Sequence, residues 1–277
     1  MDIIDSHHHL WHYDAAQYPW IPPASLLAQT YLGEEITAAA TSAGITGTVV
    51  VQARQSIQET ADLCTIAEKF PIVRGVVGWL PLIEENIAQL LAEWTQQPAL
   101  KGLRHVLQEE PVEFFRNPHF HRGLAAMAAT NLRYDLLIYE HQIPLAIEIL
   151  DAHPQLPMIL DHIGKPVIQN GEISSTWRDG MRQMSERDNL IGVKISGMVT
   201  EVRDATLDDA TLCQYIDETI EIFGIDRVMF GTDWPVCLLR VEQYRHWPDL
   251  VRAHLSRLSS AEQQAIFSQN AIRCYQM

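Results

Sequence analysis

The sequence has few cysteines, few basic residues and no long apolar run, and each shortage excludes a class of protein. Neither a disulfide framework nor a zinc finger is predicted, because no Cys-x-x-Cys pair occurs and the four cysteines are far apart: Cys64, Cys213, Cys237 and Cys274. Reduced thiols in a cytoplasmic protein are therefore expected. No apolar segment approaches the length of a membrane span.

Basic residues number 20 against 35 acidic residues, which gives a net charge of −15. Nucleic acids and anionic membranes both select concentrated positive charge, so neither is expected as a partner. No signal peptide precedes His7, and cleaving one would remove the histidines discussed below, which argues against secretion. No exposed apolar stripe can be recognised in the sequence, so a homo-oligomer stays open.

Eight short apolar runs recur along the chain. Parallel strands buried on both faces give such runs, and strands are predicted over residues 3–6, 45–51, 72–78, 100–103, 134–138, 158–160, 190–193 and 227–230. Helical patterns occupy residues 34–42, 61–70, 84–97, 120–131, 145–152, 177–187 and 212–223, and a capping box at Ser259 and Glu262 opens a last helix toward Tyr275. Residues 13–32, rich in proline and aromatics, are expected to form a long loop over the barrel mouth.

This alternation predicts an α/β fold, a TIM-like (β/α)8 barrel, formed by one domain over residues 1–277. No Gly/Ser-rich linker divides the chain. An open doubly wound sheet is the alternative. The barrel is favoured because polar residues recur at the carboxyl ends of the strands, and a barrel gathers those ends into one ring.

The first predicted strand ends in three consecutive histidines. Alternate side chains of a strand share a face, so His7 and His9 point one way and His8 the other. Two imidazoles on one face can chelate a divalent metal or bind an anionic or carbonyl substrate directly. A tag remnant or a fortuitous cluster is the alternative, and it is disfavoured because the later chain supplies partners.

The ring of strand ends predicts one site formed by His7, His9, Arg104, His162, Lys194 and Asp233. Each has a structural alternative: Arg104 or Lys194 could form an ion pair, His162 could be a hydrogen-bonded core histidine, and Asp233 could cap a turn. Lys194 lies in an apolar strand, where an unpaired charge is costly, so it must meet an anion, a substrate or water. Their joint occurrence at strand ends favours a functional site.

Five motifs and the chain's ending carry a family resemblance: residues 5–11 (DSHHHLW), 101–104 (KGLR), 160–166 (LDHIGKP), 193–197 (VKISG), 230–235 (FGTDWP) and 270–275 (NAIRCY). Together they resemble the amidohydrolase superfamily, and within it the sugar-lactonase branch of L-fuconolactonase- and L-rhamnonolactonase-like hydrolases. The resemblance covers essentially the whole chain. It implies a distorted (β/α)8 barrel of amidohydrolase type that hydrolyses a cyclic ester.

The resemblance also implies roles for individual residues. The positions that match the superfamily's metal ligands are His7, His9, His162 and Asp233. Arg104 and Lys194 match basic residues that grip the lactone or its carboxylate. No strand-end lysine stands where other superfamily members bridge two metals, so a binuclear centre is not expected. Members of this branch range from zinc-bound to metal-independent, which leaves open whether one divalent ion, zinc or manganese, is required.

The predicted reaction is hydrolysis of a sugar-derived lactone, an aldono-1,4- or 1,5-lactone such as L-fuconolactone, to the sugar acid, as part of carbohydrate metabolism. Asp233 is interpreted as the general base that deprotonates water and returns the proton to the leaving alkoxide. A metal, or the histidines with Arg104 and Lys194, would polarise the carbonyl. The expected catalytic set is therefore Asp233, His162, Arg104 and Lys194.

Further substrate contacts are expected from side chains near the strand ends, namely Trp11, Gln52, Trp79, His105 and Tyr139, and Trp20 and Trp234 are also candidates for packing on a sugar ring. Two other functions remain open. A metal-dependent decarboxylase or another hydrolase on the same barrel would be recognised by its different products. A non-catalytic barrel that binds a sugar acid or a metal would show tight binding without turnover.

Overall fold

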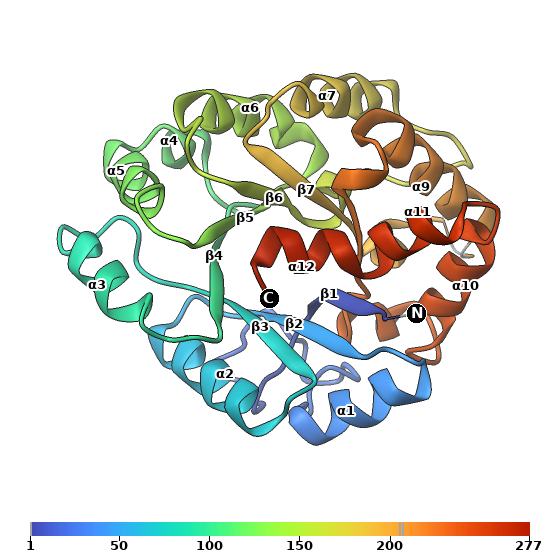
Figure 1. Ribbon diagram of the computed structural model, residues 1–277, viewed down its shortest axis with the longest axis horizontal. Helices are drawn as coiled ribbons and strands as arrows, with labels where there is room; N and C mark the ends of the chain where they lie inside the picture. The colour runs from blue at the N-terminus through green and yellow to red at the C-terminus, as the bar shows by residue number, and fades with distance from the viewer. Residues whose placement is uncertain (1, 205, 207) are drawn as a thin grey trace.

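The computed structural model describes residues 2–204, 206 and 208–277. Its strands are parallel and follow one another around a barrel in chain order (Figure 1). They are β1 Ile4–His8, β2 Gly47–Val51, β3 Val73–Gly78, β4 Leu100–Val106, β5 Arg133–Leu137, β6 Met158–Leu160, β7 Leu190–Ile195 and β8 Val228–Phe230. All eight expected strands are present, and their arrangement confirms the (β/α)8 barrel.

Most helices surround the strands on the outside, whereas α12 lies across the ring of strands (Figure 1). The helices are α1 Gly33–Ser42, α2 Ile57–Lys69, α3 Ile87–Trp94, α4 Val112–Phe115, α5 Pro118–Met127, α6 Ile143–Ala152, α7 Ser175–Ser185, α8 Met198–Glu201, α9 Asp209–Phe223, α10 His246–Leu255, α11 Ser260–Gln264 and α12 Asn270–Tyr275. The sequence did not predict α4, α8 or α10. The proline of α10, Pro248, lies in its first turn, where a missing N–H is tolerated. No described helix combines the length and apolar character that crossing a membrane requires.

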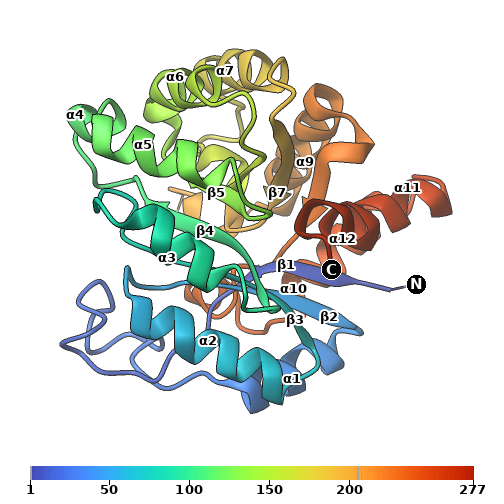
Figure 2. The same ribbon diagram turned by 60° about the vertical axis from the view of Figure 1, so that its left-hand side comes forward.

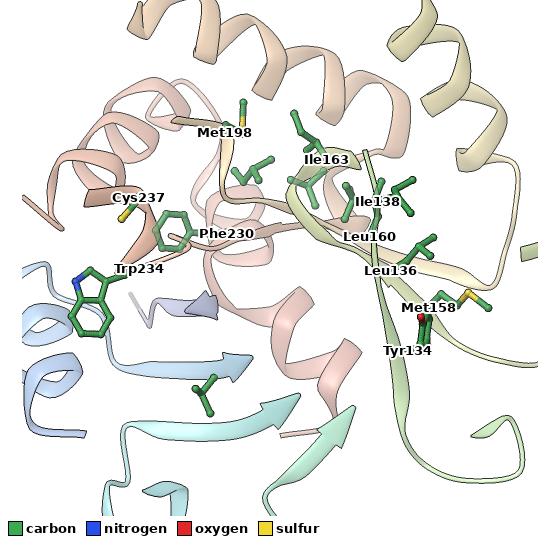
Figure 3. Close-up of a cluster of buried hydrophobic side chains, with 14 of the residues drawn as sticks. Tyr134, Leu136, Ile138, Met158, Leu160, Ile163, Met198, Phe230, Trp234 and Cys237 are labelled. Atoms are coloured by element: carbon green, nitrogen blue, oxygen red, sulfur yellow. The ribbon is translucent and has the colours of Figure 1, made fainter. Parts of the chain in front are cut away.

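Alternation along each strand separates an outer core from the barrel interior. On β5, Tyr134 and Leu136 pack outward with Ile138 and residues of neighbouring strands (Figure 3). Asp135, between them, points the other way and bonds to Lys194 of β7 inside the barrel. The interior therefore holds the charged groups, and the apolar shell between strands and helices holds the fold together.

Backbone hydrogen bonds beyond the strand ends close the barrel between β8 and β1. The backbone amide of His9 donates to the carbonyl oxygen of Trp234 at 2.7 Å. The backbone amide of Asp233 donates to the carbonyl oxygen of His7, also at 2.7 Å. These bonds place the loop after β8 directly beside the histidine pair.

The carboxylate of Asp5 reinforces this closure. It accepts hydrogen bonds from the backbone amides of His7 (3.2 Å) and Thr232 (2.8 Å), and from the hydroxyls of Thr232 (2.6 Å) and Tyr244 (2.9 Å). Because Asp5 is fully buried, burial raises its pKa to about 6 despite these four donors. One side chain of the first strand thus fixes the loop that carries Asp233.

The C-terminal segment covers the amino ends of the strands. The helices α11 and α12 are joined by the π-helical turn Ala265–Gln269, and α12 crosses the ring of strands beside β1 (Figures 1 and 2). Side chains of Ala271, Cys274 and Tyr275 form an inner apolar core with strand residues such as Ile4 and Val49. The end of the barrel at the amino ends of the strands is therefore filled by α12 and the π-helical turn before it.

Residues 12–32 form the expected long loop, with only short turns in it. Trp11 and Tyr31 pair through their backbones at 2.8 and 2.9 Å, and the Trp11 indole N–H donates to the carbonyl oxygen of Gln29 at 2.8 Å. The Trp20 indole N–H donates to the carbonyl oxygen of Ala53, just beyond β2, at 3.0 Å. These bonds hold the loop against the carboxyl ends of the first strands.

Candidate active site

The histidines of the first strand point to one centre. The Nε2 atoms of His7 and His9 lie 3.3 Å apart, whereas His8 turns to the hydroxyl of Thr48 at 3.0 Å, as strand alternation predicts. Nδ1 of His9 lies 2.8 Å from the carbonyl oxygen of Val51. Because a carbonyl only accepts, this nitrogen carries a proton, and Nε2 is the atom that the ring directs to the centre.

Asp233 and His162 complete the cluster from opposite parts of the barrel. Both have left-handed backbone angles, with φ of 60° and 54°, which is uncommon outside glycine and recurs at functional sites. One carboxylate oxygen of Asp233 lies 3.2 Å from Nε2 of His9, 3.8 Å from that of His7 and 3.9 Å from that of His162. Three imidazoles therefore surround a single carboxylate oxygen.

The orientation of His162 depends on the residues that follow β7. Its Nδ1 bonds to the hydroxyl of Ser196 at 2.9 Å, which leaves Nε2 directed toward Asp233. The next residue, Gly197, has φ 65°, and a Cβ there would lie 2.5 Å from Nδ1 of His162. Glycine is thus required at this position for the backbone angle and for the close approach of the ring.

Burial sets the charge of the cluster. It lowers the pKa of His162 to about 4 and that of His7 well below its usual value. Burial alone would raise the pKa of Asp233, but the imidazoles around it outweigh this effect and hold the pKa below its ordinary value. Neutral imidazoles and an ionised carboxylate are the forms that bind divalent metals.

The geometry of the cluster also suits a metal. His7, His162 and Asp233 each offer a ligand atom within 4.8 Å of the others, and the free Nε2 of His9 lies beside them. Nitrogen and carboxylate donors of this kind fit zinc and related borderline ions. Of the four residues predicted as metal ligands, His7, His162 and Asp233 therefore form one group, and Nε2 of His9 lies 3.3 Å from that of His7.

Arg104 of β4 is fixed beside the cluster. Its Nη1 donates to Asp161 at 3.0 Å and lies 3.4 Å from Nε2 of His7, and its Nη2 donates to the carbonyl oxygen of Gln52 at 2.5 Å. The sequence did not single out Asp161. Burial alone would raise the pKa of Asp161, but the ammonium of Lys194 and the other neighbouring cations lower it well below its usual value.

Lys194 lies behind His7 and does not line the cavity. Its side chain has no exposed surface, and its Nζ lies 2.6 Å from Asp135, 2.8 Å from Asp161 and 3.2 Å from Nδ1 of His7. The expectation that Lys194 contacts substrate is therefore corrected. Carboxylates inside the barrel satisfy the charge that the sequence left without a partner.

A cavity of about 330 Å³ opens over the cluster. His9, Arg104, His162 and Asp233 contribute polar atoms to its wall. The other lining residues are Trp20, Ala53, Val106, Gln108, Glu109, Leu137, Tyr139, Lys165 and Val236. Arg104 and Tyr139, which were predicted to contact substrate, both line this cavity, and its wall combines apolar with hydrogen-bonding groups.

Trp20, and not Trp11, provides the indole at the cavity wall. Trp11 is buried behind it, with the two rings in an edge-to-face contact at 5.6 Å. Trp20 is 44% exposed and lines the cavity. Both tryptophans were candidates for packing on a sugar ring, and which of them faces the cavity depends on the path of the loop, which sequence patterns do not determine.

Gln52, Trp79 and His105 lie outside the cavity wall, which corrects the expectation that they contact substrate. The amide nitrogen of Gln52 donates to the carbonyl oxygen of Arg104 at 3.1 Å. The indole of Trp79 donates to Nδ1 of His105 at 3.3 Å, and Nε2 of His105 bonds to Glu110 at 2.8 Å. These side chains support the loops around the site through contacts within the protein.

Sequence reasoning missed three polar residues of the wall, Gln108, Glu109 and Lys165. Lys165 follows His162 by three positions, and that spacing could have suggested it. Its ammonium lies 3.0 Å from Glu201. Gln108 and Glu109 stand in a loop after β4 whose composition carries no signal for a binding site.

The comparisons with known proteins agree with this fold. The Amidohydrolase family profile matches residues 4–277, and the chain belongs to this family. An L-fucono-1,5-lactonase of Burkholderia multivorans is 36% identical over 286 residues, which cover 98% of this chain and 95% of that protein. An L-fucono-1,5-lactonase of Burkholderia ambifaria is 28% identical, and the match covers 85% of this chain and 81% of that protein. The crystal structure of an amidohydrolase from Burkholderia multivorans with bound zinc matches with a TM-score of 0.94 at 35% identity, over 100% of both chains.

Proposed function

We propose that this chain hydrolyses a sugar-derived lactone, an aldono-1,4- or 1,5-lactone such as L-fuconolactone, to the corresponding sugar acid. The observation that carries the proposal is the carboxylate of Asp233, surrounded by three imidazoles at the wall of a small cavity. The names of the two Burkholderia lactonases support the same reaction.

Asp233 can serve both proton transfers of this reaction. Ester hydrolysis needs a base for the attacking water and an acid for the departing alkoxide. The ionised carboxylate accepts a proton from water as the water oxygen bonds to the lactone carbonyl carbon. The protonated acid then donates that proton to the ring oxygen as the ester C–O bond breaks, which restores the carboxylate.

Arg104 is proposed to stabilise the charge that develops on the carbonyl oxygen. Its guanidinium is charged at all relevant pH values, and it lines the cavity beside His9 and Asp233. Its Nε has no protein acceptor among the residues that the structure describes. Contacts to Asp161 and Gln52 hold the group in place, so little reorganisation is needed when the substrate reacts.

We further propose that one divalent ion, zinc or manganese, is held by His7, His9, His162 and Asp233. The zinc in the related Burkholderia multivorans structure supports this assignment. When bound, such an ion polarises a carbonyl and lowers the pKa of a coordinated water to about 7.

The charges of the wall favour a neutral substrate. Its two cations already have carboxylate partners, Asp161 for Arg104 and Glu201 for Lys165. Glu109 adds a negative charge to the same wall. A substrate with two negative charges, such as a dicarboxylate, would meet no unpaired cation among these groups. A neutral sugar lactone, by contrast, can place its hydroxyls on the polar groups and its C–H face on Trp20.

Proton release from a panel of aldonolactones, in weak buffer, tests the proposal. Acidification on one stereochemical series is expected, with kcat at least ~100-fold lower in Asp233→Asn and with the melting temperature of the metal-free protein unchanged. Loss of activity on chelation, with recovery on adding zinc or manganese, would support the metal. Activity that survives with an empty site would assign the electrophile's role to Arg104 and the histidines. Release of carbon dioxide from an aromatic or enol acid, with no lactone turnover, would overturn the proposal.

A further inference from the structure

A charged network lies behind His7, on the side away from the cavity. Lys194 donates to Asp135 at 2.6 Å, and its Nζ lies 2.8 Å from Oδ1 of Asp161 and 3.2 Å from Nδ1 of His7. The same Asp161 oxygen lies 3.3 Å from Nδ1 of His7 and can accept its proton. None of these side chains has exposed surface. Oxygens of two carboxylates therefore hold the ammonium beside the His7 ring. The position of the ammonium relative to the His7 ring is therefore well determined.

Tyr275 of α12 joins the same network from the side of the barrel where the amino ends of the strands lie. Its hydroxyl donates to the oxygen of Asp135 that also receives Lys194, at 2.6 Å, and its ring centroid lies 5.3 Å from the Lys194 ammonium. The other Asp135 oxygen has no hydrogen-bond partner in the described part of the chain. Tyr275 and Lys194 are thus the groups that orient this carboxylate.

Stability alone does not account for such a network. A buried ion pair contributes little net stability, and apolar residues of similar volume often replace one without loss. Around Tyr275 the inner core is otherwise apolar, with residues such as Val77 and Ile159. The hydrogen bonds lead to Nδ1 of His7, whose other nitrogen belongs to the Asp233 cluster.

We propose that Tyr275 is a positioning residue of the active site, acting on His7 through Asp135 and Lys194. The C-terminal helix then has a catalytic consequence as well as a structural one. A metal-binding histidine uses one ring nitrogen for the metal and the other for a hydrogen bond within the protein. Removing the groups that hold this second nitrogen lowers metal affinity or activity by roughly 10- to 100-fold. The kinetic part of this inference rests on the proposed lactonase function, whereas its structural part does not.

The variant Tyr275→Phe tests the inference because it removes one hydroxyl and keeps the ring under Lys194. Tyr215→Phe is the matched control: Tyr215 is also fully buried, its hydroxyl donates to the carbonyl oxygen of Glu172 at 3.4 Å, and its ring packs against Trp177. No hydrogen bond among the described residues joins it to Asp135 or Lys194. The ring-nitrogen NMR shifts of His7, zinc affinity by chelator competition, kcat and KM are measured for both variants.

In Tyr275→Phe, we expect changed His7 ring shifts, zinc binding weaker by about 10-fold, and kcat lower by about 10-fold with KM within twofold. The control is expected to keep all four values. Unchanged His7 shifts in Tyr275→Phe would overturn the inference, whether or not the protein proves to be a lactonase. Changes that Tyr215→Phe reproduces would also overturn it, since they would reflect general destabilisation.

Asp135→Asn provides a second, independent check. If Tyr275 acts through Asp135, the double variant with Tyr275→Phe will shift the His7 ring no further than Asp135→Asn alone, because the route is already broken. Additive shifts in the double variant would show that Tyr275 and Asp135 act separately, and would contradict the proposed route.

Discussion

At the scale of single residues, the site depends on side chains that sit on unusual backbone. His162 and Asp233 both have positive φ, and the neighbouring Gly197 leaves room for the His162 ring. Strain of this kind costs of order 1–3 kcal/mol for each residue and persists only where surrounding structure fixes it. The closure around Asp5 and the bond from His162 to Ser196 provide that fixation.

Gly197→Ala separates strain from function at this position. Alanine at φ 65° should lower the free energy of unfolding by about 1–2 kcal/mol and, because its Cβ would meet the His162 ring, should also lower kcat by at least ~10-fold. Gly44→Ala is the matched control, since Gly44 has φ 68° and an added Cβ there would meet only the Arg252 side chain, at an ordinary contact distance of 3.8 Å. It should lose similar stability and keep its activity. Chemical denaturation and steady-state kinetics measure both, and equal kcat in the two variants would contradict this role for Gly197.

At the scale of elements, the long first loop is held by a buried carboxylate on α2. Glu59 accepts hydrogen bonds from the hydroxyl of Tyr18 (2.9 Å) and from the amides of Ala53 (3.0 Å) and Arg54 (2.9 Å). These contacts join the loop to the segment after β2, where the indole of Trp20 also bonds. The cavity wall formed by Trp20 therefore depends on Glu59.

Glu59 should make stability depend on pH. Burial, with the hydrogen bonds acting against it, raises its pKa from 4.5 to about 7. A raised carboxyl pKa means that the folded state binds the proton more tightly, so the contribution to stability is present below pH 4.5 and is lost as pH rises through 7. The loss amounts to at most about 3 kcal/mol.

Denaturation curves of Glu59→Gln between pH 4 and 8 measure this contribution. The variant should show a smaller decline in unfolding free energy over that range than the parent. Glu262→Gln is the control: Glu262 is an exposed capping residue whose pKa is lowered by its hydrogen bonds to Ser259, so its replacement should not reduce the decline. Parallel curves for Glu59→Gln and the parent would contradict the assignment.

Most strands and helices were predictable from the sequence. How far each interior side chain lies from the mouth of the barrel was not. Strands buried on both faces leave a clear apolar signal, so all eight were found. The helix α10 was not predicted, although Pro248 lies in its first turn, where proline is tolerated. Lys194 was placed correctly on the lumen side of β7, but sequence gives the face of a strand residue and not the layer in which its end group lies. Its partner Asp135 stands in the middle of a strand and carried no signal.

At the scale of the whole molecule, a metal would couple the site to global stability. An ion that binds only the folded state stabilises it by RT ln(1 + [ion]/Kd), about 2.7 kcal/mol at 100 times Kd. For a chain of this length, zinc or manganese at that excess should raise the melting temperature by roughly 5 °C. His162→Ala should abolish the increase. A melting temperature that does not respond to either ion would contradict the proposed ligand set.

The meeting of β1 with α12 has a consequence for how the protein is made. Tyr275 leaves the ribosome after His7, by roughly 15–55 s at ordinary rates of synthesis. Throughout that time the nascent chain carries its histidines without the helix that packs beneath them. If Tyr275 positions His7 as proposed, the site is completed only after α12 has been synthesised, and a chain that stalls or is truncated before Tyr275 should be released with a weakened metal site.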